Sequence, residues 1–172
     1  QGFELSLFAA EPDIKKPIYM NWDERGRLWV IETVDYPNTV KDDKEEGDDR
    51  IKIIEDTDGD GRADKFTIFA EKLNIPTSFT FANDGIIVSQ APYFLYLKDT
   101  NGDDRADVKD TLITGWGVFD THAGPNNLRY GFDNKIWGVL GYSGFNGVSG
   151  NSDTLKFGQG VYHFNADGSG LN

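Results

Sequence analysis

An aspartate-rich turn that occurs twice constrains the fold of this chain more than any other feature. The turn Asp56-Thr-Asp-Gly-Asp-Gly-Arg-Ala-Asp64 returns 43 positions later as Asp99-Thr-Asn-Gly-Asp-Asp-Arg-Ala-Asp107, and a degenerate copy lies at 165–170. Each copy follows an apolar segment with the character of a β-strand. A repeat of this length indicates similar supersecondary units that stack side by side.

A second repeat alternates with the first. It is a polar turn followed by a hydrophobic strand, at Asp23–Val30, Asn83–Val88 and Asp133–Gly138. One unit therefore contains this turn, a buried strand, further strands and an Asp-rich turn, over roughly 40–60 residues. Because Trp29 and Trp137 follow the turn at equivalent places, we expect both to be core residues.

The strand signals are short apolar or alternating runs between clusters of Asp, Gly and Asn, and no convincing run has the period of a helix. The predicted strands are Gly2–Ala9, Leu28–Glu32, Ile51–Glu55, Lys65–Ala70, Ile86–Ser89, Phe94–Lys98, Leu128–Tyr130, Ile136–Leu140 and Gly160–Asn165. Repeats of this kind are typical of a β-propeller, whose blades are four-stranded sheets. An irregular β-sandwich is the alternative.

We therefore predict an all-β fold and one partial β-propeller domain over residues 1–172. A blade of ~40–50 residues gives about two and a half to three blades, whereas a closed propeller needs four or more. We expect the domain to be truncated at its C-terminus. The remaining blades or another chain would then cover its open apolar faces.

Composition excludes several classes of protein. The 172 residues include no cysteine, which excludes disulfides, thiolate metal sites and a cysteine nucleophile. The 17 basic and 29 acidic side chains give a net charge of −12, which argues against nucleic acid or an anionic membrane as the partner. The longest uncharged stretch, residues 136–152, is too rich in Gly, Ser and Asn for a membrane span, and Gln1 precedes strand-like sequence without a signal peptide.

The first Asp-rich turn has the spacing of a calcium loop. Asp56, Asp58 and Asp60 occupy positions 1, 3 and 5, and Gly61 occupies position 6. Calcium suits such a loop because it takes 6–8 oxygen ligands in irregular geometry. Position 12 is Thr67 and no helix flanks the turn, so it is not an EF-hand. The alternative is a solvated turn without metal.

The second turn is a weaker version of the first. Asn101 replaces an aspartate, and Asp104 stands at position 6, where a positive φ is needed and Asp is tolerated better than most residues. Because both turns recur with the repeat, we expect a structural role. The predicted metal ligands are Asp56, Asp58, Asp60, the carbonyl of Arg62, Asp64, Asp99, Asn101, Asp103 and Asp107.

His122 is the candidate catalytic residue. It lies in a polar loop before a buried strand, and imidazole is the side chain best suited to accept a proton near neutral pH. Asp120 is placed to orient it and to raise its basicity. The candidate residues for binding an anionic or hydroxylated ligand are Asn126, Asn127 and Arg129. The alternative is a loop histidine with ordinary hydrogen bonds, and packing is the expected role of the other histidine, His163.

Two further segments have simpler interpretations. Asp42–Asp49 is expected to be a charged, solvated loop. Tyr142–Gly150 is rich in glycine, and we interpret it either as a flexible insertion or as the lining of a ligand channel.

Several motifs together resemble a known family. They look like the N-terminal propeller of the membrane-bound dehydrogenase family of planctomycetes, verrucomicrobia and Bacteroidetes, over nearly the whole chain. The motifs are Gly2–Pro12, Met20–Val30, Asp35–Pro37, Arg50–Gly61, Asp120–His122 and Gly158–Tyr162, followed by Asp167–Ser169. Members often carry a C-terminal haem-binding domain. The resemblance implies a periplasmic or cell-surface location and a haem-containing electron acceptor as partner.

More distantly, the chain is similar to the soluble quinoprotein glucose and sorbosone dehydrogenases, six-bladed propellers that hold pyrroloquinoline quinone (PQQ) and Ca²⁺. This similarity implies oxidation of a sugar or alcohol, in which His122 removes the hydroxyl proton and the quinone takes the hydride. The chain departs from that pattern because Asp120 is not adjacent to His122 and the loop to Leu128 is one residue longer. The alternatives are a non-catalytic scaffold propeller of a cell-surface complex and a calcium-dependent, lactonase-like hydrolase.

Overall fold

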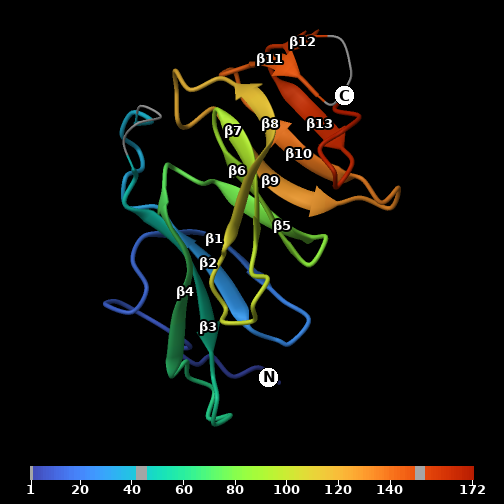
Figure 1. Cartoon of the computed structure of the whole chain (residues 1–172). Helices are drawn as coiled ribbons and strands as arrows, with labels where there is room; N and C mark the ends of the chain where they lie inside the picture. The colour runs from blue at the N-terminus through green and yellow to red at the C-terminus, as the bar shows by residue number, and fades with distance from the viewer. Residues whose placement is uncertain (1, 42–45, 150–153) are drawn as a thin grey trace.

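The fold is all-β, as the repeats predict. The computed structural model describes residues 2–41, 46–149 and 154–172, and thirteen strands form three antiparallel sheets in them (Figure 1). Sheet A has the order β1-β2-β3-β4. Its strands are β1 (Pro17–Trp22), β2 (Leu28–Glu32), β3 (Asp49–Glu55) and β4 (Lys65–Leu73).

Sheet B contains the next four strands and a hairpin added from further along the chain. Its strands are β5 (Ser78–Ala82), β6 (Gly85–Gln90), β7 (Tyr93–Lys98), β8 (Val108–Trp116), β11 (Phe145–Val148) and β12 (Thr154–Phe157). The hairpin β11–β12 pairs with β8 and so extends the outer edge of this sheet. The Gly-rich segment at 142–149 therefore includes a strand.

Sheet C is formed by β9 (Pro125–Tyr130), β10 (Ile136–Leu140) and β13 (Gly160–Phe164), with β10 in the middle. After β13 the chain turns back, and the backbone of Asn172 exchanges two hydrogen bonds of 2.9 and 3.0 Å with His163. The third, degenerate copy of the Asp-rich turn therefore does reverse the chain after a strand, as the other two do.

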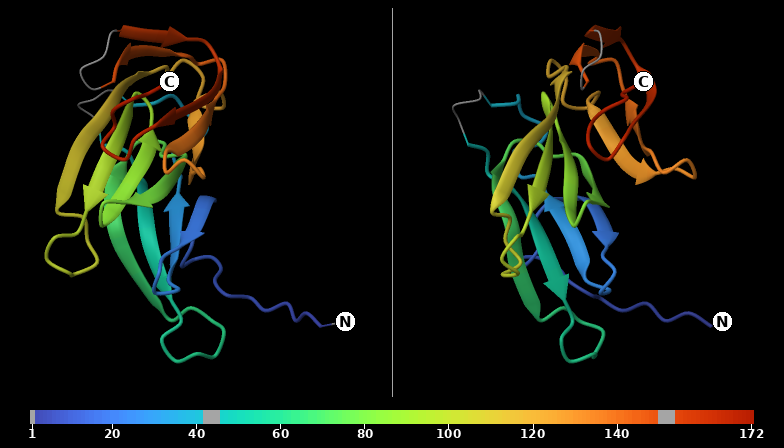
Figure 2. Two further views of the ribbon diagram at one scale, coloured as in Figure 1. Left: turned by 90° about the vertical axis from the view of Figure 1, so that its right-hand side faces the viewer. Right: turned by 45° about the vertical axis from the view of Figure 1, so that its right-hand side comes forward.

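The first strands of the three sheets lie beside one another, β1 against β5 and β5 against β9, so the sheets fan out from a common edge (Figure 2). Polar side chains join these edges. The Tyr19 hydroxyl on β1 donates to the Leu128 carbonyl on β9 at 3.3 Å, and the Leu128 amide donates to Ser78 Oγ on β5 at 3.2 Å. These bonds satisfy edge groups that a lone sheet would leave open.

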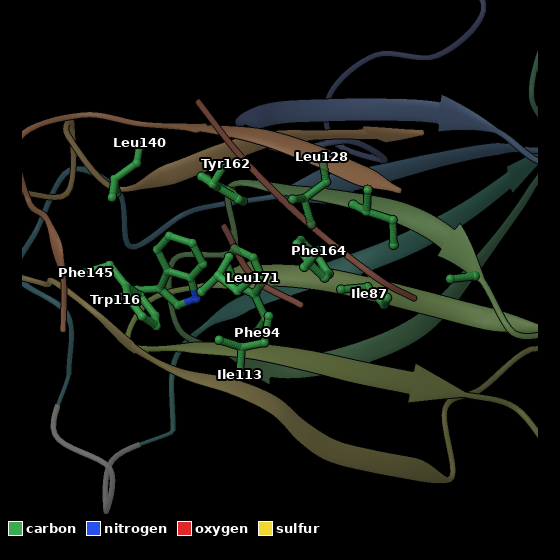
Figure 3. Packing of buried hydrophobic residues seen from close by; sticks show 12 residues of the cluster. Ile87, Phe94, Ile113, Trp116, Leu128, Leu140, Phe145, Tyr162, Phe164 and Leu171 are labelled. Atoms are coloured by element: carbon green, nitrogen blue, oxygen red, sulfur yellow. The ribbon is translucent and has the colours of Figure 1, made fainter. Parts of the chain in front are cut away.

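Two apolar cores hold the sheets together, one between sheets A and B and one between sheets B and C. In the second core, Phe94 stacks on Trp116 at 4.4 Å and Tyr162 packs against Trp116 at 4.6 Å (Figure 3). Each side chain of this size stabilises the fold by about 1.5–3 kcal/mol when it is fully buried. The sheets thus support one another face to face.

Because neighbouring strands run in opposite directions, the connections separate into two ends. The Asp-rich turns at 56–64 and 99–107 lie at one end, which we call the turn end; loops 33–41, 117–124 and 141–144 lie at the other, which we call the loop end. Contacts between sheets confirm this alignment. Arg27 reaches Asp104 at the turn end.

Three expectations about local structure are wrong. Gly2–Ala9 forms no strand; Phe3 and Leu5 are fully exposed, because its alternating pattern has no neighbouring strand to pair with among the described residues (Figure 2). Trp137 is 36% exposed, whereas Trp29 is 6% exposed, because no described element covers that face of sheet C. Asp49 is not solvated: it begins β3 and is fully buried.

Candidate functional site

His122 and Asp120 lie together at the loop end, in the connection from β8 to β9. Asp120 Oδ1 accepts a hydrogen bond from the His122 backbone amide at 2.9 Å and lies 3.0 Å from His122 Nδ1. The first bond is an Asx turn, which follows from the two-residue spacing and fixes the carboxylate beside its neighbour's ring. The structure therefore brings together the two residues that the sequence suggested as a catalytic pair.

The Asp120 carboxylate selects the tautomer of His122. Hydrogen bonds from the Tyr142 hydroxyl, the His122 amide and the His122 ring lower the pKa of Asp120, so this carboxylate is ionised and only accepts. The proton of a neutral His122 must then sit on Nδ1, which leaves a lone pair on Nε2. No hydrogen bond to Nε2 occurs among the described residues, and the His122 side chain is 61% exposed. Nε2 is free to accept a proton from a bound molecule.

Tyr142 fixes the other oxygen of Asp120. It lies just after β10, and its hydroxyl donates to Asp120 Oδ2, a contact that raises the pKa of Tyr142 because ionisation would place two negative charges together. The neighbouring Ser143 Oγ donates to the Asp120 carbonyl at 2.7 Å. Sequence reasoning missed the role of Tyr142, although it named the segment that begins there as a possible channel lining.

Tyr36 brings the first sheet into the same site. It belongs to the loop after β2, and its ring meets the His122 ring edge-on, with centroids 5.3 Å apart. The Thr121 hydroxyl donates to the Pro37 carbonyl at 3.2 Å, which ties the two loops together. The sequence singled out Asp35–Pro37 only as part of the family resemblance and gave Tyr36 no role, because its closeness to His122 arises only when the sheets pack.

Asp49 holds the loop that carries Tyr36. One of its oxygens accepts from the Asp35 amide at 2.9 Å and the other from the Ile75 amide at 2.7 Å. Burial raises the pKa of Asp49 even though these amide donors oppose the change. Asp49, at the end of the segment that was expected to be solvated, is therefore buried and holds the loop of the site in place. Residues 42–45 of that segment lie outside the described residues.

A hollow of about 270 Å³ opens beside His122. Its lining combines aromatic rings, hydroxyl groups and side-chain amides, namely Ile18, Tyr19, Tyr36, Thr77, Thr121, His122, Asn126 and Asn127. The Asn127 amide donates to Asn126 Oδ1 at 2.9 Å, and Asn127 has a positive φ of 59°. This set of neutral donors and acceptors suits a ligand with hydroxyl groups better than a strongly charged one.

The third predicted binding residue lies apart from the hollow. Arg129 pairs across the ladder with Trp137 on β10, and its charge only moderates the pKa of Tyr19, which burial raises. Among the residues that line the hollow, none is a lysine or an arginine. PQQ carries three carboxylates, so the lining of the hollow does not provide the cations that would hold it there.

At the turn end, the first Asp-rich turn gathers three carboxylates. Ligand atoms of Asp56, Asp58 and Asp60 lie within 4.8 Å of one another, and no other group of three or more such residues occurs in the described parts of the chain. Amides of Gly59 and Gly61 donate to Asp56 at 2.7 and 2.8 Å. Donation from Gly61 is the main cause that lowers the pKa of Asp56.

Asp64 and Asp60 accept hydrogen bonds from other residues of the same turn. Asp64 accepts from the Thr57 amide at 3.0 Å and from the Thr57 hydroxyl at 2.7 Å, and it is not part of the group of three carboxylates. The Arg62 amide donates to Asp60. Oxygens for a hard cation would therefore come first from Asp56, Asp58 and Asp60.

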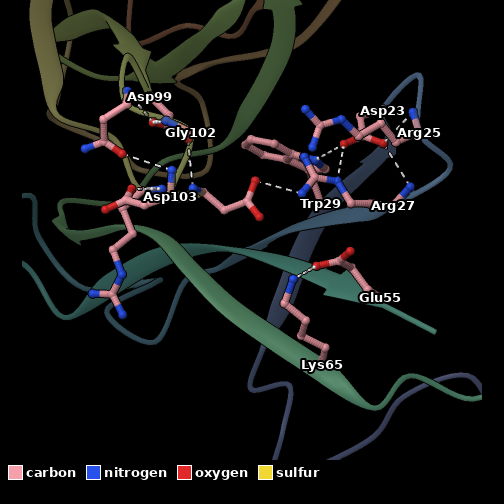
Figure 4. A network of polar contacts seen from close by, with 12 residues as sticks. Asp23, Arg25, Arg27, Trp29, Glu55, Lys65, Asp99, Gly102 and Asp103 are labelled. Atoms are coloured by element: carbon pink, nitrogen blue, oxygen red, sulfur yellow. Dashed lines mark hydrogen bonds and ion pairs between the residues drawn. The ribbon is translucent and has the colours of Figure 1, made fainter. Parts of the chain in front are cut away.

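The second turn repeats these bonds and adds two that involve Asn101, from its amide to Asp99 and from its side chain to Asp107. Asp99 accepts from the amides of Asn101, Gly102 and Asp104 (Figure 4). Asp107 accepts from the Thr100 amide and hydroxyl. Asn101 Oδ1 accepts from the Asp103 amide at 2.9 Å. Asp104 takes the positive φ expected at position 6, 62°. The scaffold is the same, with one carboxylate fewer in the inner positions.

Arg27, in the turn before β2, forms an ion pair with one carboxylate of the second Asp-rich turn. Arg27 pairs with Asp104 and with Asp23, both at 2.8 Å, and Asp23 also accepts from Trp29 Nε1 at 3.0 Å (Figure 4). Burial lowers the pKa of Arg27, but the two carboxylates outweigh burial and raise it. Arg27 thus links the turn that starts sheet A to the second Asp-rich turn.

Fold and site together define an all-β domain of packed antiparallel sheets with an aspartate-oriented histidine at the loop end. The chain belongs to the family described as a domain of unknown function, DUF7133, whose model matches residues 1–172. No match was found among curated proteins or among solved structures. The described residues contain no helix able to cross a membrane.

Proposed function

We propose that this domain oxidises a hydroxyl group of a small sugar or alcohol and that His122 is the base. The observation that carries this proposal is the pair of Asp120 and His122, with Nδ1 bound and Nε2 free, beside a hollow of hydroxyl, amide and aromatic groups. Oxidation of an alcohol needs a base for the hydroxyl proton and an acceptor for the hydride. His122 Nε2 would take the proton.

The neighbouring side chains support this role of His122. The Asp120 carboxylate holds the ring in one tautomer and stabilises the imidazolium that forms when Nε2 takes the proton. Tyr142 and Ser143 hold Asp120, and Tyr36 covers one side of the ring. Asn126 and Asn127 are placed to bind hydroxyl groups of the substrate.

The hydride acceptor that we propose is PQQ, as the similarity to the quinoproteins implies. Its carboxylates would need cations from outside the lining of the hollow, because that lining contains no lysine or arginine. The proton step at His122 is the same whichever two-electron acceptor is present. We also propose that the domain is exported and passes electrons to a haem-containing domain.

We propose further that the three sheets are consecutive blades of a β-propeller. The support is the contact of β1 with β5 and of β5 with β9 along one common edge, and the cores between sheets A and B and between sheets B and C. Ca²⁺ at Asp56, Asp58 and Asp60 would be a structural ion in one of the outer turns. A metal-dependent hydrolase would need a group of metal ligands beside His122, and in the described residues the acidic group lies at the opposite end.

The test is an oxidation assay with a panel of sugars and alcohols, Ca²⁺, PQQ and an artificial electron acceptor. Substrate-dependent reduction of the acceptor that is lost in His122→Asn would support the proposal. Equal activity of the wild type and His122→Asn would show that His122 is not the base. If PQQ does not bind in a saturable titration, the non-catalytic scaffold becomes the better description.

A further inference from the structure

Two exposed aromatic rings lie at the loop end beside the aspartate that orients His122. Phe119, in the loop from β8 to β9, is 73% exposed, and Tyr142, in the loop after β10, is 58% exposed. Their ring centroids are 5.8 Å apart, and the rings are tilted by 49° to each other. We call this pair the ring platform. The proton transfer proposed above does not involve Phe119.

Hydrogen bonds join the two loops that carry the ring platform. The Gly117 amide donates to the Gly144 carbonyl at 2.8 Å. Ser143 Oγ and the Tyr142 hydroxyl both donate to Asp120. The loops approach so closely that a Cβ on Gly117 would collide with the Ser143 carbonyl oxygen. The exposed rings are therefore carried on a backbone that is already ordered, which lowers the entropy cost of binding a ligand.

The ring platform is continuous with the hollow beside His122. Tyr36 and His122 line the hollow, and their rings are 5.3 Å apart. Asp120 contacts His122 on one side and Tyr142 on the other. The row therefore contains two pairs of rings with a carboxylate between them. A molecule that occupied the hollow and also covered the ring platform would be longer than one sugar unit.

The chemistry of this row fits a neutral saccharide. A sugar ring presents C–H groups, which are attracted to the electron-rich face of an aromatic ring, and its hydroxyl groups bind carboxylates and side-chain amides. Asp120 is ionised beside the ring platform, and the chain has a net charge of −12. These charges favour a neutral saccharide over an acidic one. A chain of neutral sugar units matches both the rings and the polar groups between them.

We propose that the ring platform binds the second sugar unit of an oligosaccharide whose terminal unit occupies the hollow beside His122. The inference rests on the proposed oxidation of a sugar and narrows its substrate to neutral oligosaccharides. Phe119 and Tyr142 then increase the affinity for substrates longer than one unit. Phe119 takes no part in the chemical step, so it determines the preference for chain length alone.

Equilibrium binding tests the ring platform without any redox reaction. The probes are glucose, mannose, galactose and xylose and their neutral oligosaccharides of two to four units, titrated by calorimetry into the full-length protein. We expect affinity to rise about 10-fold from one unit to two, and Phe119→Ala to remove this rise. The proposal would be overturned by affinity that does not increase with length, by equal affinity in Phe119→Ala, or by no binding of any saccharide.

Two control variants separate the loss of the ring from damage to the fold. Phe119→Trp keeps an aromatic face and should retain the dependence on length. Phe132→Ala removes another exposed phenylalanine, at the opposite end of β9 from His122, and should change neither affinity nor melting temperature. Phe119→Ala should also melt normally, because its side chain is mostly exposed.

Kinetics distinguish failure of this inference from failure of the proposed oxidation. In Phe119→Ala, kcat/KM should fall about 10-fold for the disaccharide and stay unchanged for the single sugar. If no sugar is oxidised but binding depends on length and on Phe119, the oxidation is wrong and the ring platform is supported. If sugars of every length are oxidised with the same KM, the ring platform is wrong and the oxidation is supported.

Discussion

Aspartate is used in two different ways at the two ends of this domain. At the turn end, Asp99 accepts from three backbone amides within five residues, so its oxygens are occupied by its own turn. At the loop end, Asp120 begins with the same kind of bond to the amide two residues on, but its remaining contacts are the His122 ring and the Tyr142 hydroxyl. The first arrangement stabilises a local turn, and the second joins side chains from different sheets.

The comparison teaches that the donors around an aspartate, and not the Asx turn, separate one that holds its own turn from one that orients other side chains. Changes at the loop end should therefore alter activity and leave stability nearly intact, because His122 and Tyr142 are exposed. Changes at the turn end should alter stability and leave activity intact.

The largest effect is expected for His122→Asn. Loss of the base should lower kcat/KM for the oxidised alcohol by about 10²–10⁴-fold. The melting temperature should stay the same, because the side chain is mostly exposed. Asp99→Asn is the matched control from the turn end and should keep full activity. Normal turnover in His122→Asn would show that His122 is not the base and would contradict the proposed difference between the two ends.

Asp120→Asn should give the next largest loss of activity. The Asn amide can donate to Nδ1, which favours the tautomer with the proton on Nε2 and removes the acceptor from the hollow. We expect a fall in kcat of at least about 10²-fold with little change in KM. The same exchange at Asp167, which accepts from Ser169 in the third turn, is the control. A loss confined to KM would indicate a substrate-binding role for Asp120.

Tyr142→Phe should have a smaller effect, because Tyr142 acts through Asp120. We expect a loss of activity of about 10-fold, as is common for residues that orient a functional group. Loss of the hydroxyl donor should also raise the pKa of Asp120 toward its ordinary value of about 3.9. Carbon-13 NMR of the Asp120 carboxyl group measures this shift. An unchanged pKa would show that Tyr142 does not hold Asp120.

At the turn end, Asp99→Ala should lower the free energy of unfolding by about 1–2 kcal/mol, because three amide donors lose their acceptor. Burial raises the pKa of Asp99, but the amides of Gly102 and Asp104 outweigh it and lower the pKa overall. The stability that Asp99 contributes is therefore present above pH about 3.9 and is lost as the pH falls through the lowered pKa. Denaturant unfolding at several pH values, with and without the substitution, measures both effects.

The smallest expected effect is a calcium-dependent rise in melting temperature, which should distinguish the two Asp-rich turns. We expect Ca²⁺ to raise the melting temperature of the wild type by a few degrees and Asp58→Asn to abolish the change, because the inner group of the first turn loses a carboxylate. Asn101→Asp restores the same pattern in the second turn and should add a second bound ion. Calorimetry that finds no calcium binding in the wild type would leave both turns as metal-free structures.

The strands that the sequence predicted well are short apolar runs that directly follow a polar turn. Leu28–Glu32 and Ile136–Leu140 are strands β2 and β10 with the predicted bounds. Strand β8 was missed because its sequence mixes Lys, Asp and Thr with its apolar residues, a pattern that suits its partly exposed position. The alternation of Gly2–Ala9 predicted a strand whose partner does not occur among the described residues.

The site could be predicted only where its members are close in sequence. Asp120 and His122 are two residues apart, and the Asx turn makes them neighbours regardless of the fold. Tyr36 reaches His122, and Tyr142 reaches Asp120, only through the packing of the sheets, which no local pattern encodes. Arg129 was grouped with Asn126 and Asn127 by sequence, but the irregular register at this point of β9 places it across from Trp137.

Nitrogen-15 NMR of the histidine rings tests the central claim most directly. The claim is that Asp120 holds the proton of neutral His122 on Nδ1 and leaves Nε2 free to act as the base. We predict that NMR will show the Nδ1–H tautomer for His122 in the wild type and its loss in Asp120→Asn. A wild-type protein in which neutral His122 carries its proton on Nε2 would contradict this assignment, because the nitrogen that does not bind Asp120 could not accept a proton.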